Sequence, residues 1–308
     1  MMNISVIGAG YVGLITGIGF AKLNHQVSIV DLNDDLIKNL NENRPPFYEP
    51  ELVDYLNDSN IRNNLFFSTS YQKSINENTD IVFVCVQTPT DPDTGKTKTD
   101  YISSVLTELK KIESFNFIIC IKSTIKATLV EKISNEIDLD YKKIIFNPEF
   151  LREGSAFYDF FNPDRIVIGG SDQKGLNQCT ELYESFDCEK IITDSNSSQM
   201  IKYLSNTYLA MRLSFVNETY RLVSEFNGNP EEVLNAIGKD KRIGNDYFRP
   251  SPGWGGSCFP KDVKEVISSF QMDYQLPIIS EILRSNELHM EWFVDYILKI
   301  INEQSLEN

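Results

Sequence analysis

The segment from Gly255 to Asp262 combines a cysteine with the residue types that begin a helix. It reads Gly-Gly-Ser-Cys-Phe-Pro-Lys-Asp, so Cys258 follows a candidate helix cap, Ser257, and precedes Pro260, which a first helical turn tolerates. The partial positive charge of a helix N-terminus favours a thiolate, and Asp262 would lie one turn further along the same face. The pattern therefore indicates a nucleophilic thiol with a carboxylate beside it. A buried structural cysteine next to a turn is the alternative.

Two more pairs of polar residues stand at helical spacing. Glu149 and Glu153 follow a predicted strand and Pro148, so both carboxylates could project from one turn, although an exposed charged turn is the more common outcome. Lys202 and Asn206 lie in a mostly apolar helical stretch. A lysine buried there would need a partner and would suit general acid–base chemistry. The alternative is a lysine whose ammonium group reaches solvent along the apolar surface.

The start of the chain has the pattern of a dinucleotide-binding turn. A short apolar strand at residues 4–7 runs into Gly-Ala-Gly-Tyr-Val-Gly at residues 8–13, and a helical pattern follows. The next strand, at residues 27–30, ends in Asp31. The glycines would permit a tight turn and close approach of a pyrophosphate, while Asp31 would accept from ribose hydroxyl groups and disfavour a 2′-phosphate. The pattern predicts NAD rather than NADP; a glycine turn in a nucleotide-free α/β domain is the alternative.

These groups need a sheet that positions them, and apolar runs alternate with helical patterns downstream of the glycine turn. The runs cover residues 80–86, 117–121, 144–146 and 165–169, and the helical patterns cover 101–113 and 126–137. This alternation predicts an α/β fold with a Rossmann-like, doubly wound parallel sheet. Thr88 and Pro89 follow one such strand, at the carboxyl edge where ligands lie in open α/β sheets.

Composition narrows the class of protein. A chain of 308 residues is long for one core and predicts two domains. The formal net charge of −15 argues against nucleic acid or an anionic membrane as partner, and no apolar run has the length of a membrane span. The five cysteines form no metal-ligand pattern, so we expect a cytoplasmic protein without a bound metal. His25 and His289 are expected to be solvated at the surface.

Together these motifs resemble the nucleotide-sugar dehydrogenases, and within them the UDP-glucose 6-dehydrogenases. The matching segments occur in the family's order over nearly the whole chain; they are Gly8 to Gly13, Tyr48-Glu49-Pro50, Thr88-Pro89-Thr90, Ser123-Thr124, Asn147 to Ala156, Lys202 with Asn206, Arg242-Ile243-Gly244, and Gly255 to Asp262. Residues 162–169 are typical of the UDP-glucose branch. The alternatives are a dehydrogenase of another nucleotide sugar (GDP-mannose or a UDP-N-acetylhexosamine), a simple two-electron dehydrogenase, and a non-catalytic NAD-binding partner subunit.

The resemblance implies a four-electron oxidation of UDP-glucose to UDP-glucuronate with two NAD molecules per turnover. Cys258 would capture the C6 aldehyde as a thiohemiacetal, which would be oxidised to a thioester and hydrolysed. Lys202 and Asn206 would stabilise the oxyanion at C6. The residues that would position water or move protons are Asp262, Thr124, Glu153 and, as general base of the hydrolysis, Glu149.

The resemblance also implies two sets of binding residues. The expected cofactor contacts are Gly8, Gly10, Tyr11, Val12, Gly13, Asp31, Thr88, Pro89, Thr124, Glu153 and Lys261. The expected substrate contacts are Phe150, Leu151, Arg152, Lys202, Asn206, Arg242, Tyr247, Phe248, Arg249, Ser251 and Gly253. Arg242 would reach the substrate of a neighbouring subunit, which implies a homodimer.

In the family, a helical region that forms the dimer core follows the NAD-binding domain. The resemblance therefore divides this chain into an NAD-binding Rossmann-like domain at residues 1–193 and an all-helical central dimerisation domain at residues 194–308, which carries Cys258. The family's second nucleotide-binding domain, which forms one wall of the substrate cleft, is expected to be absent. Leu36 also departs from the family, in which a basic residue often lies near the adenosine ribose.

Overall fold

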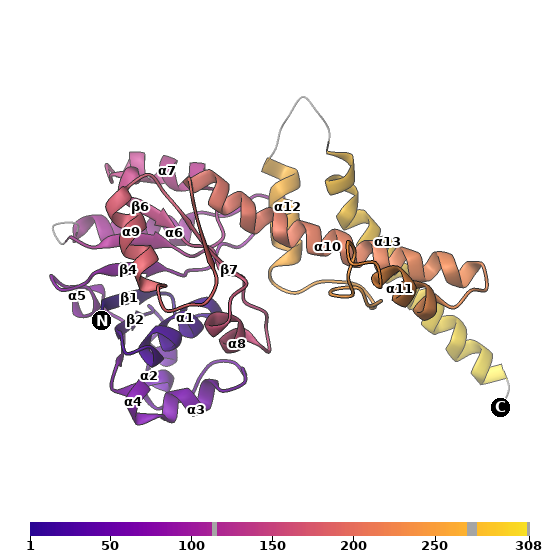
Figure 1. The fold of residues 1–308 in the computed structure, drawn as a ribbon, viewed down its shortest axis with the longest axis horizontal. Helices are drawn as coiled ribbons and strands as arrows, with labels where there is room; N and C mark the ends of the chain where they lie inside the picture. Colours follow the sequence, from indigo (N-terminus) through magenta and orange to yellow (C-terminus); the bar gives the residue numbers. More distant parts are fainter. Residues whose placement is uncertain (113–115, 270–275, 307–308) are drawn as a thin grey trace. The chain divides into compact units, whose positions relative to one another are not determined.

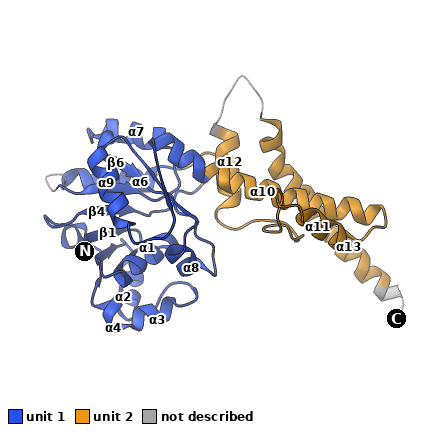
Figure 2. Cartoon of the chain, viewed as in Figure 1, with its two compact units in different colours: residues 1–89, 98–202 blue, residues 90–97, 203–308 orange. Residues whose placement is uncertain are grey.

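The computed structural model describes residues 1–112, 116–269 and 276–306, and the chain divides into two compact units (Figure 1, Figure 2). Unit 1 comprises Met1–Pro89 and Lys98–Lys202, and unit 2 comprises Thr90–Thr97 and Tyr203–Asn308. The short loop at residues 90–97 therefore belongs with the C-terminal half, although both of its neighbours in the chain belong to unit 1. The domain boundary between residues 193 and 194 stays a prediction.

An eight-stranded sheet forms the centre of unit 1. Its strands are β1 (Asn3–Ile7), β2 (Gln26–Val30), β3 (Leu65–Ser68), β4 (Ile81–Val84), β5 (Ile118–Ile121), β6 (Ile144–Phe146), β7 (Arg165–Gly169) and β8 (Glu189–Thr193). They lie in the order β3-β2-β1-β4-β5-β6-β7-β8, which confirms the Rossmann-like doubly wound sheet.

One pair of strands departs from the parallel prediction. All neighbours are parallel except β6 and β7, which pair antiparallel through Phe146 and Gly169. The chain between them forms an irregular loop and the short helix α8 (Ala156–Phe161), which packs against the first helix of the unit. The chain then re-enters the sheet in the reverse direction.

Helices cover both faces of the sheet. Those of unit 1 are α1 (Tyr11–Lys22), α2 (Asp34–Asn41), α3 (Leu52–Asn57), α4 (Ser59–Arg62), α5 (Tyr71–Ser74), α6 (Asp100–Lys111), α7 (Ala127–Glu136), the 3₁₀ helix η1 (Tyr141–Lys143), α8 and α9 (Gln173–Leu182). Alternate residues of β4 enter different cores: Ile81 and Phe83 join the cluster that contains α1, whereas Val82 and Val84 join the one that contains α6 and α7. A strand buried on both faces needs a continuous apolar run, which is why this strand was visible in the sequence.

Unit 2 is built on two long helices, α10 (Ser195–Glu225) and α13 (Pro277–Leu306). The first of them, α10, begins in unit 1 and continues into unit 2, where α11 (Pro230–Gly238) and α12 (Phe259–Ser269) stand between the two in the chain. Ala210, Trp254, Val263 and Ile282 form a small core. Within the described residues, unit 2 holds these helices and one isolated bridge in the loop 90–97, which confirms the all-helical prediction. No helix in the described ranges is both long and apolar enough to cross a membrane.

Candidate active site

The glycine turn after β1 has the geometry of a dinucleotide site. Gly8 adopts a φ of 100°, and a Cβ there would lie 2.8 Å from the carbonyl oxygen of Cys85. A Cβ at Gly13 would lie 1.8 Å from the carbonyl oxygen of Gly8, so the helix can approach the turn only with glycine at that position. A Cβ at Gly10 would meet no atom within 4 Å, which leaves the face of the turn open for a ligand.

The start of α1 and the end of β2 complete this site. Gly10 caps α1 without a side-chain hydrogen bond, and the first turn, which begins with Tyr11 and Val12, carries no acidic residue. Its amide groups can therefore receive a diphosphate. Asp31 follows β2, and its Oδ2 accepts a hydrogen bond of 2.9 Å from the amide of Ala9. This contact holds the carboxylate beside the turn, where a ribose hydroxyl is recognised. The residues present fit NAD.

Two further strand ends lie on the same carboxyl edge. The Thr88 hydroxyl donates to the carbonyl oxygen of Thr124 over 2.9 Å, and the Ser123 hydroxyl donates to that of Val86 over 2.6 Å. The segments after β4 and β5 are thereby bound together, with Pro89 directly after Thr88. The structure thus brings Thr88, Pro89 and Thr124 to the edge that carries the glycine turn.

A buried ion pair joins the loop after β6 to α10. Lys202 Nζ lies 3.0 Å from Glu149 Oε1, and both side chains are less than a tenth exposed. Glu149 also accepts a hydrogen bond of 2.6 Å from the amide of Leu151, and the Lys202 ammonium lies 5.4 Å from the ring centre of Phe150. Burial raises the pKa of Glu149, but the charge of Lys202 and the hydrogen bond lower it by more, so this pKa lies below its ordinary value. Glu149 is therefore ionised at neutral pH.

Sequence reasoning assigned no role to the residue that shapes this loop, Glu49. Its buried carboxylate accepts from the Tyr11 hydroxyl at 2.8 Å, from the Gly154 amide at 2.9 Å and from the Ala156 amide at 2.8 Å. Burial and the neighbouring Glu49 raise the pKa of Tyr11, which keeps this hydroxyl protonated as a donor. The Tyr-Glu-Pro motif at residues 48–50 was the signal in the sequence, but it does not indicate which groups donate to the Glu49 carboxylate.

The loop itself differs from the expectation of two carboxylates on one turn. Residues 147–152 form no helix or turn; Glu149 is buried, whereas Glu153 is exposed. The main-chain amides of Leu151, Gly154 and Ala156 bond to the side chains of Glu149 and Glu49, and the amide of Arg152 bonds to Asp159, so Glu149 and Glu153 do not lie on one helical turn. Arg152 donates to Asp159 through Nε over 3.0 Å, so this expected substrate contact already has a carboxylate partner.

In unit 2 a second carboxylate is held from two sides. Asp262 is 1% exposed; its Oδ2 accepts a hydrogen bond of 2.6 Å from Asn206 Nδ2, and its Oδ1 pairs with Lys261 Nζ at 2.6 Å. Lys202 and Asn206 lie one turn apart on α10, and each contacts a different buried carboxylate. Lys202 pairs with Glu149 of unit 1, and Asn206 donates to Asp262 of unit 2. The two side chains that the sequence placed together on the helix therefore bind two separate carboxylates.

Cys258 lies at the start of α12, as its sequence context predicts. Its carbonyl oxygen accepts the first bond of the helix, from the amide of Asp262 over 2.9 Å, which makes Cys258 and not Ser257 the cap residue. The thiol is exposed, 3.5 Å from the Ser257 hydroxyl, while the other cysteines are buried or half-buried. The position one turn from Asp262 is confirmed; the role of the thiol stays a prediction.

The segment before Cys258 is held by polar side chains of α10 and α13. Asn217 Oδ1 accepts from the amide of Ser251 at 2.9 Å, and the side-chain amide of Asn286 both accepts from the amide of Trp254 and donates to its carbonyl oxygen, each at 2.9 Å. His289 Nε2 lies 2.7 Å from the carbonyl oxygen of Ser251. The surface position expected for His289 is wrong: it is 2% exposed, because it faces this loop.

The remaining expected substrate residues of unit 2 differ in exposure. Tyr247 has a φ of 52° and is partly exposed, and Arg249 is exposed. Phe248 is buried, with the Arg212 guanidinium 5.0 Å above its ring. A Cβ at Gly253 would lie 2.6 Å from Met290. Arg242 is exposed and pairs with Asp240 at 2.7 Å.

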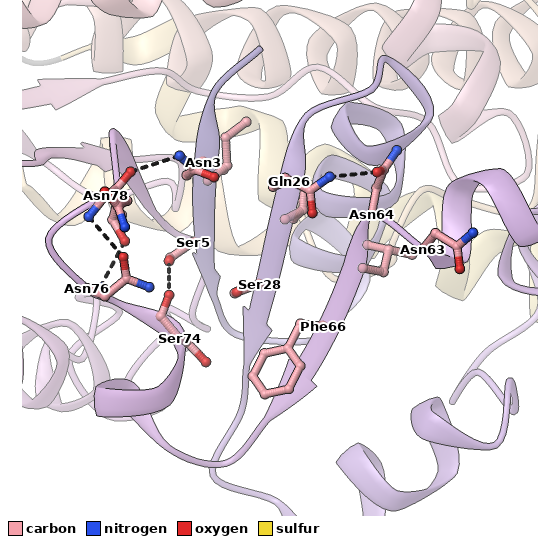
Figure 3. A pocket seen from close by; sticks show the side chains of 14 residues that line it. Asn3, Ser5, Gln26, Ser28, Asn63, Asn64, Phe66, Ser74, Asn76 and Asn78 are labelled. Carbon is pink, nitrogen blue, oxygen red and sulfur yellow. Dashed lines mark hydrogen bonds between the residues drawn. The ribbon is translucent and has the colours of Figure 1, made fainter.

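A hollow in unit 1 lies away from these groups. It is lined mainly by polar side chains, among them Asn3, Gln26 and Asn64 (Figure 3). These residues begin β1 and β2 and precede β3, so the hollow lies at the amino ends of the strands, opposite the glycine turn. The described residues contain no cluster of three or more His, Cys, Asp or Glu side chains that could hold a metal ion.

Comparison with known proteins defines the class of this chain. Residues 2–187 match the NAD binding domain of the UDP-glucose/GDP-mannose dehydrogenase family, and residues 196–288 match the central domain of that family. The chain belongs to this family of nucleotide-sugar dehydrogenases, which confirms the resemblance seen in the sequence.

Individual relatives agree with this assignment. The UDP-glucose 6-dehydrogenase YwqF of Bacillus subtilis is 34% identical over 306 residues, which cover 96% of this chain and 68% of YwqF. A UDP-glucose dehydrogenase structure from Pyrobaculum islandicum superposes with a TM-score of 0.87 at 34% identity, covering 94% of this chain and 68% of that one. A GDP-mannose dehydrogenase structure from Pseudomonas aeruginosa has a TM-score of 0.74 at 28% identity, covering 97% and 71%.

Proposed function

We propose that this chain oxidises the C6 hydroxyl of UDP-glucose to the carboxylate of UDP-glucuronate, with two NAD molecules in turn and Cys258 as the nucleophile. One observation carries the proposal: an exposed thiol starts α12, with a buried aspartate held by Asn206 and Lys261 one turn on. A simple two-electron alcohol dehydrogenase has no use for this thiol. Membership in the nucleotide-sugar dehydrogenase family supplies the substrate class.

Most of the expected cofactor contacts lie in unit 1. The glycine turn and the first amides of α1 would bind its diphosphate, Asp31 its adenosine ribose, and the edge at Thr88, Pro89 and Thr124 its nicotinamide half. Glu153 and Lys261 are the further candidate contacts. When bound, NAD supplies the hydride acceptor for both oxidations.

The protein groups divide the remaining chemistry between them. After the first oxidation, the Cys258 thiolate would add to the carbonyl carbon of the C6 aldehyde, and the oxyanion would be stabilised by Lys202 and Asn206. The second oxidation would leave a thioester. Water would attack its carbonyl carbon, the C–S bond would break, and the uronate and the free thiol would form. Glu149, ionised beside Lys202, would accept the proton of this water, and Asp262 would move protons at the thiol.

The stoichiometry of the reaction tests this proposal. The purified chain with NAD and limiting UDP-glucose should form two NADH per sugar consumed, whereas a two-electron dehydrogenase forms one. Cys258→Ser should abolish the formation of uronate, because no thioester can form. One NADH per sugar in both proteins would contradict the thioester route. NAD binding without any NADH formation would favour a non-catalytic partner subunit.

The identity of the sugar needs its own comparison, since the structural relatives include a GDP-mannose dehydrogenase. The resemblance of residues 162–169 to the UDP-glucose branch of the family supports UDP-glucose. A panel of UDP-glucose, GDP-mannose and UDP-N-acetylmannosamine should give a kcat/KM for UDP-glucose at least about tenfold above the others. A preference for GDP-mannose would overturn the substrate while leaving the reaction type in place.

We also propose that unit 2 pairs with a second copy of the chain. An exposed apolar stripe at steps of four and seven residues runs along α10 and ends one residue beyond it; it is formed by Leu204, Tyr208, Phe215, Leu222 and Phe226. Arg242 would act across the resulting interface. Light scattering should give a dimer, and Phe215→Glu with Leu222→Glu should give a monomer. Tyr158→Glu, at an equally exposed aromatic of unit 1, is the matched control and should leave the dimer intact. A wild-type monomer would contradict both the interface and the role of Arg242.

A further inference from the structure

The loop between β4 and α6 is a closed hairpin that belongs to unit 2. Thr90 and Thr97 form an isolated antiparallel bridge, and the Asp91 amide donates to the Lys96 carbonyl oxygen over 2.8 Å. At the tip, Asp91 Oδ1 accepts from the amide and the hydroxyl of Thr94 at 2.9 and 3.0 Å. These contacts fix the shape of the loop, so it can act as one rigid part.

A buried carboxylate fastens this hairpin to α12. Glu265 is 1% exposed, and its Oε2 accepts two hydrogen bonds from Thr97, one from the amide at 2.6 Å and one from the hydroxyl at 2.7 Å. Next to it, the Ser268 hydroxyl donates to the carbonyl oxygen of Gly95 over 3.1 Å. Hydrogen bonds to an ionised acceptor are about twice as strong as neutral ones, and a buried carboxylate without donors would be costly. Thr97 and Glu265 therefore form a specific clasp.

The helix that this clasp holds carries the two candidate catalytic groups of unit 2. Glu265 lies one turn after Asp262 on α12, and both side chains are 1% exposed. Cys258 caps the same helix. At its other end, the hairpin continues into Pro89 and Thr88, the candidate cofactor contacts that follow β4. A single short segment thus links the cofactor edge to the helix of the nucleophile.

We propose that Thr97 and Glu265 are positioning residues for the oxidation. The clasp fixes α12 on the hairpin and thereby sets where Cys258 and Asp262 stand. Catalytic groups must be placed closely, since a displacement of about 1 Å can cost on the order of a hundredfold in rate. The role in oxidation rests on the proposed function; the effect of the clasp on the thiol does not.

The test compares variants of one hydroxyl. Thr97→Val removes the hydroxyl donor and keeps the amide donor, Thr97→Ser retains both, and Glu265→Gln removes the charge of the acceptor. Thr99→Val is the matched control, because the Thr99 side chain makes no capping hydrogen bond. Each variant is assayed for kcat, for the KM of NAD, for thermal unfolding, and for the rate at which iodoacetamide alkylates Cys258. The half-buried Cys188 is the internal reference in the same mass spectra.

We expect Thr97→Val to lower kcat about tenfold, with the KM of NAD within about twofold of wild type, and Thr97→Ser and Thr99→Val to match wild type. Glu265→Gln should lie between them. Alkylation of Cys258 in Thr97→Val should change at least about threefold relative to Cys188. If Thr97→Val remains folded with wild-type kcat and wild-type alkylation, the clasp has no positioning role. If wild type itself forms no NADH, the proposed function fails. The alkylation rates alone then show whether the hydrogen bonds between Thr97 and Glu265 position Cys258.

Discussion

At the scale of single residues, Glu149 and Asp262 are buried carboxylates that each keep a lysine ammonium within 3.0 Å. A buried charge whose partner is removed is strongly destabilising. We therefore expect Glu149→Gln to lower the free energy of unfolding by about 3 kcal/mol, because the buried Lys202 would lose the carboxylate that lies 3.0 Å from its ammonium group. Urea denaturation at neutral pH measures this. The same variant should also slow the proposed hydrolysis, because the amide cannot accept a proton.

The pair should also give stability a definite pH dependence. The folded-state pKa of Glu149 is lowered, while an unfolded glutamate titrates at about 4.3. The contribution of Glu149 to the free energy of unfolding is therefore fully present above about pH 4.3 and is lost as the pH falls through the folded-state pKa. The stability difference between wild type and Glu149→Gln should shrink only in that range. Glu108→Gln, at a partly exposed ion pair with Lys111, is the control and should cost less than about 1 kcal/mol. If Glu149→Gln loses as little free energy of unfolding as this control, the buried ion pair between Glu149 and Lys202 does not stabilise the fold as proposed.

Among the elements, the helix α13 holds the loop that leads into Cys258 through side-chain hydrogen bonds. Asn286 and His289 lie one turn apart and bond to the main chain of Trp254 and Ser251. Burial lowers the pKa of His289, and the nearby Arg221 lowers it further, against the opposing effects of the Ser251 hydrogen bond and of Glu218. The folded state therefore holds His289 neutral at pH values at which the unfolded chain already binds a proton.

This linkage predicts a loss of stability in mild acid. The unfolded histidine takes up a proton as the pH falls below about 6.5, whereas the folded one does so only at lower pH. Protonation therefore stabilises the unfolded state relative to the folded state in this range. His289→Gln stays neutral throughout. The free energy of unfolding of wild type, relative to this variant, should fall between about pH 8 and pH 5. His25 also has a lowered pKa, but it is present in both proteins and cancels. A difference that does not vary with pH would contradict a neutral, buried His289.

Elements were predictable from the sequence where burial leaves a periodic pattern. The central strand β4 is apolar throughout because both of its faces are covered. The edge strand β8 is half-exposed, with the sequence Glu-Lys-Ile-Ile-Thr, and the four-residue β3 has an outward-facing Phe66; neither carries the signal of a buried run. Glu49 could be seen as part of a motif, but Tyr11 lies 38 residues before it and its two main-chain partners lie 105 and 107 residues after it. Contacts at such separation leave no local pattern.

At the scale of the whole molecule, the net charge of −15 opposes the ligands that the site is proposed to take. NAD and UDP-glucose are both anionic, so their binding must rely on local donors such as the α1 amides and on Lys202, against an unfavourable long-range field. Salt screens this field: the Debye length falls from about 30 Å at 0.01 M to about 8 Å at 0.15 M. The approach of any anion to the thiol of Cys258 should therefore become faster as salt is added.

A pair of alkylating reagents isolates this effect from catalysis. Iodoacetate is anionic and iodoacetamide is neutral, but both react with the same exposed thiol of Cys258. Between about 0.01 M and 0.15 M sodium chloride, the rate with iodoacetate should rise at least about twofold, while the rate with iodoacetamide stays constant. If iodoacetate instead slows with salt, cationic groups near Cys258 outweigh the total charge. Lys261, which lies three residues from the cysteine, would then be the first residue to neutralise, and Lys261→Met should abolish the slowing.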